Sequence, residues 1–236
     1  MWILADVHAG ADPAGDDALI ALLDRAIVER RDLLLLGDLF AAWLGDARFH
    51  TPLQRQVVAL LRKLRAEGAR TLFAAGNRDY FVTESQGVFD RVFDEDVVPL
   101  GGIPTLVTHG DQLNRDDRAY LAWRALSRSG AARALAHALP GPAIRGLAAR
   151  LEKGLSTTNQ AYKTGALPIA ALEALGRRAQ GLGARRALVG HFHHDRTLDV
   201  AGGVPVVIAP AWLDHRRILV VEPDGRLVST APFDAP

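Results

Sequence analysis

Short apolar runs recur along the chain, and the most uniform is residues 33–36, four consecutive leucines. A run without alternation is typical of a strand buried on both faces of a sheet. This run is followed at once by Gly37 and the carboxylate of Asp38. Four other runs also end in polar residues that can bind a ligand, and they span residues 2–5, 71–75, 105–108 and 187–189. Because open α/β sheets place their chemistry at the carboxyl ends of strands, we expect five strands to deliver these side chains to one edge.

Helical periodicity separates the first three runs. Apolar residues recur three and four positions apart between residues 16 and 30, which predicts a helix there. A second helix is expected to begin at residues 51–54, where Thr, Pro and Gln fit a capping box with proline in the first turn, and to end near Gly68. The order strand, helix, strand, helix, strand favours parallel strands with right-handed crossovers. Residues 43–49 are expected to form a loop.

The last third of the chain predicts a helix and three further strands. The helix is expected at residues 169–182 and the strands at 204–209, 217–221 and 226–230. Residues 222–225, Glu-Pro-Asp-Gly, fit a hairpin turn between the last two strands. We therefore expect a second sheet with antiparallel edges at the C-terminus.

Composition narrows the class of protein. A chain of 236 residues fits one domain, residues 1–236, with room for an insertion. The 28 Lys and Arg residues against 27 Asp and Glu leave a net charge of +1, so we expect no nucleic acid partner. The lack of cysteine excludes disulfides and thiolate metal sites and fits a reducing cytoplasm. Met1 runs straight into the first predicted strand, so no signal peptide is expected, and no apolar run approaches the ~20 residues that span a bilayer.

The middle of the chain, from about residue 114 to 163, differs from the rest. It holds nine Lys or Arg residues against three acidic ones, in a background of Ala and Leu that Gly and Pro divide into short helices. Ile144, Leu147 and Leu151 share one helical face. This pattern predicts a basic, amphipathic helical insertion. Judged alone, it fits Arg-rich helices in solvent as well as contact with an anionic membrane surface.

The polar residues after the five strands form a ligand set for two divalent metals. Asp6 and His8 are two positions apart, so on a regular strand both would face the same side and grip one ion. Each short motif alone is weak evidence for a metal site, because Gly-Asp and Gly-Asn often mark turns and histidines often lie on the surface. Their order at successive strand ends is the specific feature. The candidate ligands are Asp6, His8, Asp38, Asn77, His109, His191 and His193.

Carboxylate and imidazole ligands without thiolate suit Mn²⁺, Fe²⁺ or Zn²⁺. Two such ions ~3.5–4 Å apart can activate a water and hold both ends of an in-line displacement at phosphorus. Asp38, at the end of the most buried strand, is the natural bridge between them. The sequence therefore predicts a phosphoester or phosphoanhydride hydrolase.

These motifs resemble the calcineurin-like metallophosphoesterases over nearly the whole chain. The resemblance implies an α/β fold in which two β-sheets form a sandwich flanked by helices, here with a helical cap at the insertion. It also implies how the metals would be held. One would take Asp6, His8, Asp38 and His193, and the other would take Asp38, Asn77, His109 and His191.

Finer motifs resemble one branch, the UDP-2,3-diacylglucosamine diphosphatase family of lipid A synthesis. They are Gly37-Asp38-Leu39-Phe40, Gly76-Asn77-Arg78-Asp79, and the series from His109-Gly110-Asp111 through Asp117 and Tyr120 to Arg124. That family cleaves the pyrophosphate of a UDP-linked diacylated sugar, giving UMP and a diacylglucosamine 1-phosphate. The resemblance implies two Mn²⁺ ions, a nucleotide-linked lipid as substrate, and a peripheral location on the cytoplasmic face of the inner membrane.

Residue roles follow from the same resemblance. Catalytic roles are expected for Asp38, Asn77, Arg78 and His109. Substrate contacts are expected for Asn77, Arg78, Asp117, Tyr120, Arg124, Ser156, Gln160, Lys163 and His191.

The chain departs from the family pattern at six positions, which are Ala41, Asn114, Arg115, Gln160, Phe192 and His194. The metal ligands are complete, so the departures bear on the substrate rather than on hydrolysis. Two alternatives stay open: a soluble metallophosphodiesterase or nucleotide pyrophosphatase with a diverged substrate, and a non-catalytic scaffold of the same fold. The sequence leaves the oligomeric state open.

Overall fold

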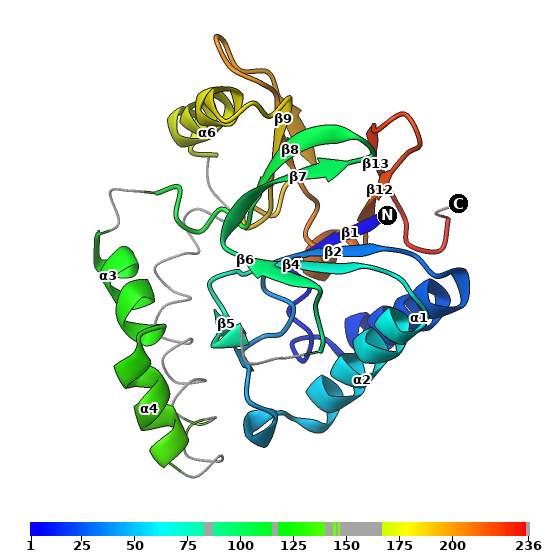
Figure 1. The fold of residues 1–236 in the computed structure, drawn as a ribbon, viewed down its shortest axis with the longest axis vertical. Coiled ribbons are helices and arrows are strands. Elements are labelled where there is room, and N and C mark those ends of the chain that lie inside the picture. The colour runs from blue at the N-terminus through cyan, green and yellow to red at the C-terminus, as the bar shows by residue number, and fades with distance from the viewer. Residues whose placement is uncertain (83–86, 115–117, 140–143, 145, 147–166, 235–236) are drawn as a thin grey trace.

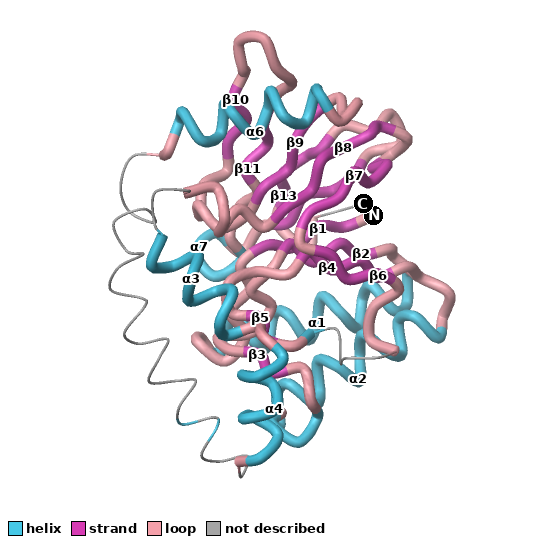
Figure 2. Tube along the Cα trace, turned by 60° about the vertical axis from the view of Figure 1, so that its left-hand side comes forward, coloured by secondary structure: helices cyan, strands magenta, loops and turns pink. Residues whose placement is uncertain are grey.

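Two β-sheets pack face to face in the computed structural model, which describes residues 1–82, 87–114, 118–139, 144, 146 and 167–234. The first sheet has six strands in the order β13-β12-β1-β2-β4-β6, and the second has five in the order β10-β11-β9-β8-β7. Helices α1 and α2 cover the outer face of the first sheet, and α6 covers the outer face of the second (Figures 1 and 2). The expected sandwich of two sheets flanked by helices is confirmed.

The first sheet is built from the leading half of the chain and completed by the C-terminal hairpin. Its strands β1, β2, β4 and β6 are parallel, β12 is antiparallel to β1, and β13 is antiparallel to β12. The bounds are β1 (Trp2–Ala5), α1 (Pro13–Glu29), β2 (Leu33–Leu36), α2 (Pro52–Ala66), β4 (Thr71–Ala74), β6 (Arg91–Phe93), β12 (Ile218–Val221) and β13 (Leu227–Thr230).

The second sheet has a parallel centre and antiparallel edges. Strands β8, β9 and β11 are parallel, whereas β7 and β10 pair antiparallel at the two edges. The bounds are β7 (Glu95–Leu100), β8 (Ile103–Thr108), α6 (Ile169–Gly181), β9 (Arg186–Val189), β10 (Arg196–Leu198) and β11 (Val206–Ile208).

Smaller elements surround the open end of the sandwich. Strands β3 (Trp43–Leu44) and β5 (Asp79–Tyr80) pair in parallel, a 3-10 helix covers Ala47–Phe49, and α7 (Trp212–His215) is a single helical turn. Within the expected insertion, α3 (Arg118–Ser127) and α4 (Gly130–Ala138) lie beside the sandwich (Figure 1). Most of the insertion's second half, including Leu147 and Leu151, lies outside the described residues.

Helix boundaries follow the capping chemistry of the sequence. The first helix begins at Pro13, three residues earlier than expected, because the Asp12 side chain accepts a hydrogen bond from the Gly15 amide as N-cap. The second helix begins as predicted, with both hydrogen bonds of a capping box between Thr51 and Gln54.

Three expectations about the fold are wrong. The ligand-bearing strands belong to two sheets rather than to one edge, since β8 and β9 pair only within the second sheet. The C-terminal strands do not start a second sheet: β11 joins it, but the β12–β13 hairpin extends the first sheet. Residues 43–49 contain a short strand and a 3-10 turn in addition to loop.

Alternate leucines of β2 serve two separate cores. Leu34 and Leu36 face the second sheet and pack in the core between the sheets, whereas Leu33 and Leu35 pack against α1 and α2. All four are at most 2% exposed, and burying one such side chain contributes ~1.5–3 kcal/mol. The uniform run of leucine therefore reflects a strand covered on both faces, as predicted.

One buried arginine joins the two sheets at the end remote from the ligand residues. The Arg186 side chain donates hydrogen bonds to Thr105 Oγ1 (2.9 Å) and to the carbonyl oxygens of Leu100 (3.2 Å) and Gly225 (2.6 Å). Gly225 belongs to the β12–β13 turn of the first sheet, whereas the other two acceptors belong to the second sheet. The guanidinium therefore holds the hairpin of one sheet against the edge of the other.

We expect Arg186→Met to lower the free energy of unfolding by about 2–5 kcal/mol, because it leaves buried oxygen acceptors without donors. Denaturant unfolding followed by circular dichroism measures the change. The matched control is Arg185→Met at the exposed neighbouring position, where we expect a change within about 0.5 kcal/mol. Equal stability of the two variants would contradict the joining role of Arg186.

Candidate metal centre

Strand ends from both sheets meet at the open end of the sandwich. β1, β2 and β4 of the first sheet and β8 and β9 of the second each precede candidate ligands. The side chains of Asp6, Asp38 and His109 are completely buried there. Contacts link all seven predicted ligands into one group, which consists of Asp6, His8, Asp38, Asn77, His109, His191 and His193.

The backbone carrying these residues is mostly left-handed. The φ angle is positive at Asp6 (49°), His8 (49°), Asp38 (51°), His191 (66°) and His193 (55°). Asp6 and His8 therefore do not meet by strand alternation as expected, because β1 ends at Ala5 and the chain then turns. Non-glycine residues in this conformation are strained and cluster at functional sites.

Glycine precedes three of the candidate ligands, and at two of these positions the strands approach too closely for any side chain. A Cβ on Gly37 would lie 2.2 Å from the Nδ1 atom of His109, and Gly37 has a φ angle of +79°. A Cβ on Gly76 would lie 2.4 Å from Asp38 Oδ1. The glycines thus let the imidazole and carboxylate of neighbouring strands come together.

One oxygen of each buried carboxylate accepts a backbone hydrogen bond, and the other accepts none from the described residues. Asp6 Oδ2 accepts a hydrogen bond from the His191 amide, and Asp38 Oδ1 accepts one from the Arg78 amide, both at 2.8 Å. Asp6 Oδ1 and Asp38 Oδ2 accept no hydrogen bond from any residue that the structure describes. An uncompensated buried carboxylate costs several kcal/mol, so these two oxygens fit a bound cation.

The imidazole nitrogens stand at ligand spacing from these oxygens. Asp6 Oδ1 lies 3.6 Å from His193 Nε2, 3.9 Å from His109 Nε2 and 4.0 Å from His8 Nε2. Asp38 lies 3.8 Å from His109 Nε2 and 3.9 Å from His8 Nε2. Ligands bound ~2.0–2.2 Å from one ion lie roughly 3.3–3.6 Å apart, so small shifts would complete a coordination sphere.

Two groups of ligands emerge, one of Asp6, His8 and His193 and one of Asp6, Asp38 and His109. Asn77 Oδ1 extends the second group, 3.2 Å from His109 Nε2, and the His191 ring lies edge-on to His109 with 5.2 Å between centroids. Asp6 belongs to both groups, while Asp38 contacts His8 of the first and His109 of the second. The residues therefore fit two adjacent divalent ions, and bridging by Asp38 stays a prediction.

Electrostatics keep the site charged. Burial acts to raise the pKa of Asp6, but contact with His193 and the fields of His109 and His8 hold that pKa well below its usual range. Burial acts to lower the pKa of His109, yet the surrounding carboxylates Asp38 and Asp6 raise it. The same negative field that raises the pKa of an imidazole attracts a metal cation.

Two supporting carboxylates were not assigned a role from sequence. Asp79 Oδ2 accepts hydrogen bonds from the amides of Asp38 (2.8 Å) and Gly76 (2.7 Å), so it holds two ligand loops together. Burial and the charge of Asp38 raise the pKa of Asp79 to about 7. Asp214 of α7 accepts a hydrogen bond from His193 Nδ1. Asp214 lies within a helix rather than at a strand end, so the sequence pattern gave no signal for it.

The expected substrate residues near the site fall into two kinds. Arg78 lies beside the ligands: its Nε atom is 3.6 Å from Asp38 Oδ2, and its Nη1 atom donates to the Ala41 carbonyl at 3.1 Å. Tyr120 and Arg124 of α3 instead bind the buried carboxylate of Asp111, Arg124 through Nε at 2.7 Å. These two residues therefore attach the helix beside His109, and their contact with substrate stays a prediction.

The departures from the family pattern are partly accounted for. Ala41 supplies a backbone acceptor for Arg78, and Phe192 packs in the core beneath α6. Asn114 and His194 are partly exposed. The remaining predicted residues lie outside the described ranges, and they are Arg115, Asp117, Ser156, Gln160 and Lys163.

Comparison with known proteins supports the resemblance seen in the motifs. No protein-family model matches the chain. The chain is 29% identical to a protein named UDP-2,3-diacylglucosamine hydrolase from Neisseria meningitidis serogroup B, with 95% of each chain covered. It is 27% identical to a protein of the same name from Shewanella sp. strain MR-4, with 98% of each covered. The similarity to these hydrolases over nearly the whole length is confirmed.

Solved structures match only distantly. A dimetal phosphatase from Danio rerio is 12% identical, with a TM-score of 0.43 over 98% of this chain and 95% of that one. A Vps29 complexed with zinc from Entamoeba histolytica is 16% identical, with a TM-score of 0.43 over 97% and 96%. At this distance the matches add nothing about activity.

We expect Asp38→Asn to reduce bound metal below two equivalents per chain, because the amide cannot supply the charge that compensates two cations. Metal content of protein loaded with Mn²⁺ and desalted measures the change, and circular dichroism checks the fold. Asp24→Asn, at an exposed position of α1, is the control and should keep the wild-type content. A folded Asp38→Asn protein that still holds two ions would contradict the two-metal arrangement.

Proposed function

We propose that the chain is a hydrolase that depends on two divalent ions and cleaves the pyrophosphate bond of UDP-2,3-diacylglucosamine, giving UMP and 2,3-diacylglucosamine 1-phosphate. The observation that carries the proposal is an apolar pocket whose lining includes Tyr80, three residues along the chain from the candidate ligand Asn77. A charged, metal-binding site next to an apolar pocket suits a substrate with a diphosphate at one end and acyl chains at the other. The names of the similar proteins support the same substrate.

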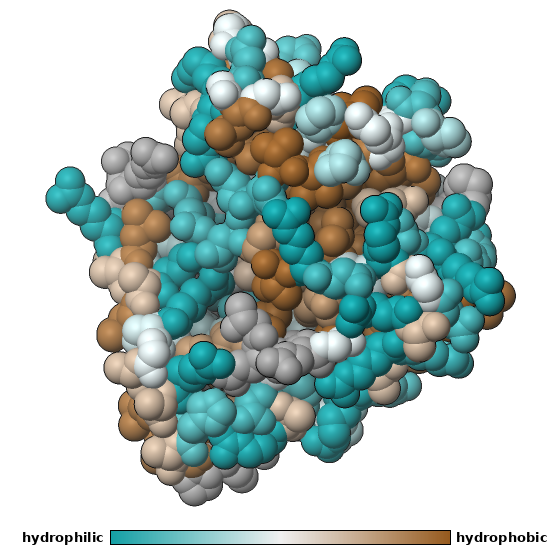
Figure 3. Space-filling view, viewed as in Figure 1, coloured by the Kyte–Doolittle hydropathy of each residue, from teal (hydrophilic) through white to brown (hydrophobic). Residues whose placement is uncertain are grey.

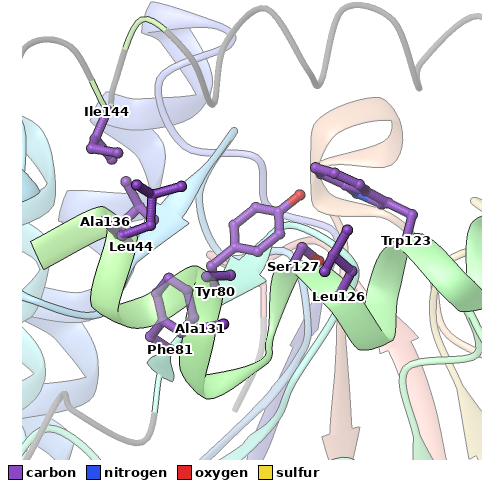
Figure 4. Close-up of a pocket in the computed structure, with 11 residues that line it drawn as sticks. Leu44, Tyr80, Phe81, Trp123, Leu126, Ser127, Ala131, Ala136 and Ile144 are labelled. Carbon is purple, nitrogen blue, oxygen red and sulfur yellow. The ribbon is translucent and has the colours of Figure 1, made fainter. Parts of the chain in front are cut away.

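The pocket lies between the helices α3 and α4 and the strands β3 and β5. It encloses about 440 Å³, within the ~300–1,000 Å³ usual for ligand pockets. Figure 4 shows Tyr80 lying between Trp123 of α3 and Leu44 of β3, with the other side chains around them. Its described lining consists of Leu44, Tyr80, Phe81, Trp123, Leu126, Ser127, Ala131, Ala132, Leu135, Ala136 and Ile144.

Exposed apolar side chains on α3 and α4 support contact with a lipid surface. Leu126 and Leu135 are 61% and 58% exposed, although both also line the pocket. Figure 3 shows apolar side chains gathered along this edge of the molecule among polar ones. No helix among the described residues is long and apolar enough to cross a bilayer. We propose that α3 and α4 rest on the membrane surface, on its cytoplasmic face, through such side chains.

The chain's own residues prepare the reaction. Bound divalent ions, proposed to be Mn²⁺, would supply an activated water and neutralise charge on the diphosphate. The buried carboxylates of Asp6 and Asp38 would hold those ions in a water-poor setting. Arg78, fixed by the Ala41 carbonyl, presents a guanidinium beside Asp38 and would bind the phosphate oxygens. His191, at the rim and 8% exposed, would contact the same group.

The direct test incubates the purified protein with Mn²⁺ and either UDP-2,3-diacylglucosamine or bis(p-nitrophenyl) phosphate, and separates products by chromatography. We expect UMP and the diacylated sugar phosphate in equal amounts, with loss of both on addition of EDTA. Turnover of the soluble diester alone would indicate the soluble phosphodiesterase instead. Metal binding without turnover of either would indicate a non-catalytic scaffold.

The pocket generates a separate prediction. Leu126→Ser combined with Leu135→Ser should raise KM for the diacylated substrate several-fold, because both side chains line the pocket, and leave turnover of a short soluble diester unchanged. Steady-state kinetics on both substrates measures the split. Leu182→Ser, 54% exposed beyond the end of α6, is the control and should change neither. Unchanged KM in the double variant would show that the pocket does not hold the acyl chains.

A further inference from the structure

We infer that Asp214 is a positioning residue that orients His193 and makes the ion held by His193 the more tightly bound of the two. This inference rests on the proposed metal-dependent function and concerns a residue outside the family motifs. Asp214 lies on the short helix α7, which sequence reasoning did not connect with the site.

The imidazole of His193 is held through its Nδ1 atom and directs its Nε2 atom into the site. Its Nδ1 atom donates a hydrogen bond to an Asp214 carboxylate oxygen. Its Nε2 atom therefore carries no proton in the neutral ring and faces Asp6 Oδ1 at 3.6 Å. A carboxylate behind a metal-binding imidazole fixes its tautomer and orientation and raises its basicity.

The second buried imidazole is held differently. His109 Nδ1 donates to the carbonyl oxygen of Leu36 at 2.9 Å, and Nε2 faces the site. A backbone carbonyl fixes the same tautomer but carries no charge. Since the two histidines belong to different ligand groups, the two ion sites are unequal: the charged partner stands behind the group of Asp6, His8 and His193.

Helix α7 is built to hold Asp214 in place. The Leu213 amide donates to the Asp6 carbonyl at 3.2 Å, and His215 Nε2 donates to the His193 carbonyl at 3.0 Å. The turn therefore contacts two ligands of one group through its backbone and side chains. Trp212, which is completely buried, anchors the other side, with its indole N–H 3.3 Å from the Gly15 carbonyl.

The C-terminal end of α7 is also held in place by side-chain contacts. Arg216 donates to the carbonyl oxygens of Trp212 (2.6 Å) and Leu213 (2.9 Å) and pairs with Asp12 in the loop before α1. If Asp214 lay on a mobile surface loop, solvent would screen most of its electrostatic interaction with His193. Asp214 is 48% exposed at its side chain, but its position is set by these contacts rather than by the ion pair alone.

The test compares Asp214→Asn and Asp214→Ala in metal binding, without substrate. Asn keeps an oxygen that accepts from His193 Nδ1 and loses the charge, whereas Ala loses both. Isothermal titration of the metal-free protein with Mn²⁺ should show two unequal sites in the wild type. We expect Ala to weaken the tighter site ~10–100-fold, Asn to weaken it less, and neither to change the weaker site.

Asp195→Asn is the matched control. It removes one negative charge two residues from His193, but Asp195 binds Ser229 and Arg217 rather than the imidazole. We expect wild-type affinities in that variant. If Asp214→Ala keeps both affinities, or weakens both sites equally, the inference is wrong. If the wild-type protein binds no Mn²⁺, Zn²⁺ or Fe²⁺, the proposed function fails instead, so the two failures are distinguishable.

Discussion

The burial of two carboxylates where the sheets meet is the constraint on which the rest of this structure depends. Asp6 and Asp38 are completely buried, and each leaves one oxygen without a hydrogen bond from the described residues. Protonation would remove the cost of one such charge, but the imidazoles of His193, His109 and His8 hold Asp6 ionised. The site thus keeps two buried carboxylate oxygens that no hydrogen bond from the described residues satisfies, which is the state expected of a site made for cations.

Holding that centre together costs the fold stability. Five non-glycine ligands adopt left-handed backbone, at roughly 1–2 kcal/mol each, against the ~5–15 kcal/mol that keeps a typical domain folded. The expense is offset by hydrogen bonds that also aim the side chains, such as those from the His191 amide to Asp6 and from the Arg78 amide to Asp38. Strain and orientation are therefore two effects of the same loops.

Sequence reasoning succeeded where information is local. The leucines of β2, the capping box of Thr51 and the polar residues after each strand could be predicted because periodicity and caps act over a few residues. It failed for the β12–β13 hairpin, since nothing in an apolar strand states which sheet will accept it. It also overlooked Asp214 and Arg186, whose roles arise from partners 21 to 86 positions away. Residues that support a site act through tertiary contacts. A sequence motif can therefore indicate candidate ligands, but it does not indicate the residues that hold them in place.

The helix α3 shows how the cap is tied to this centre. None of its residues is fully buried, and its apolar side chains Trp123 and Leu126 line the pocket. Charged side chains attach its C-terminal end: Arg124 binds Asp111 and Asp94, and Arg128, directly after the helix, binds Asp94 and the carbonyl of Gly76. Asp111 is two residues after His109, and Gly76 directly precedes Asn77, so both attachments end on loops that carry ligands. The arrangement joins α3 to the loops of the candidate metal ligands through polar contacts, so a displacement of the helix would also move those loops.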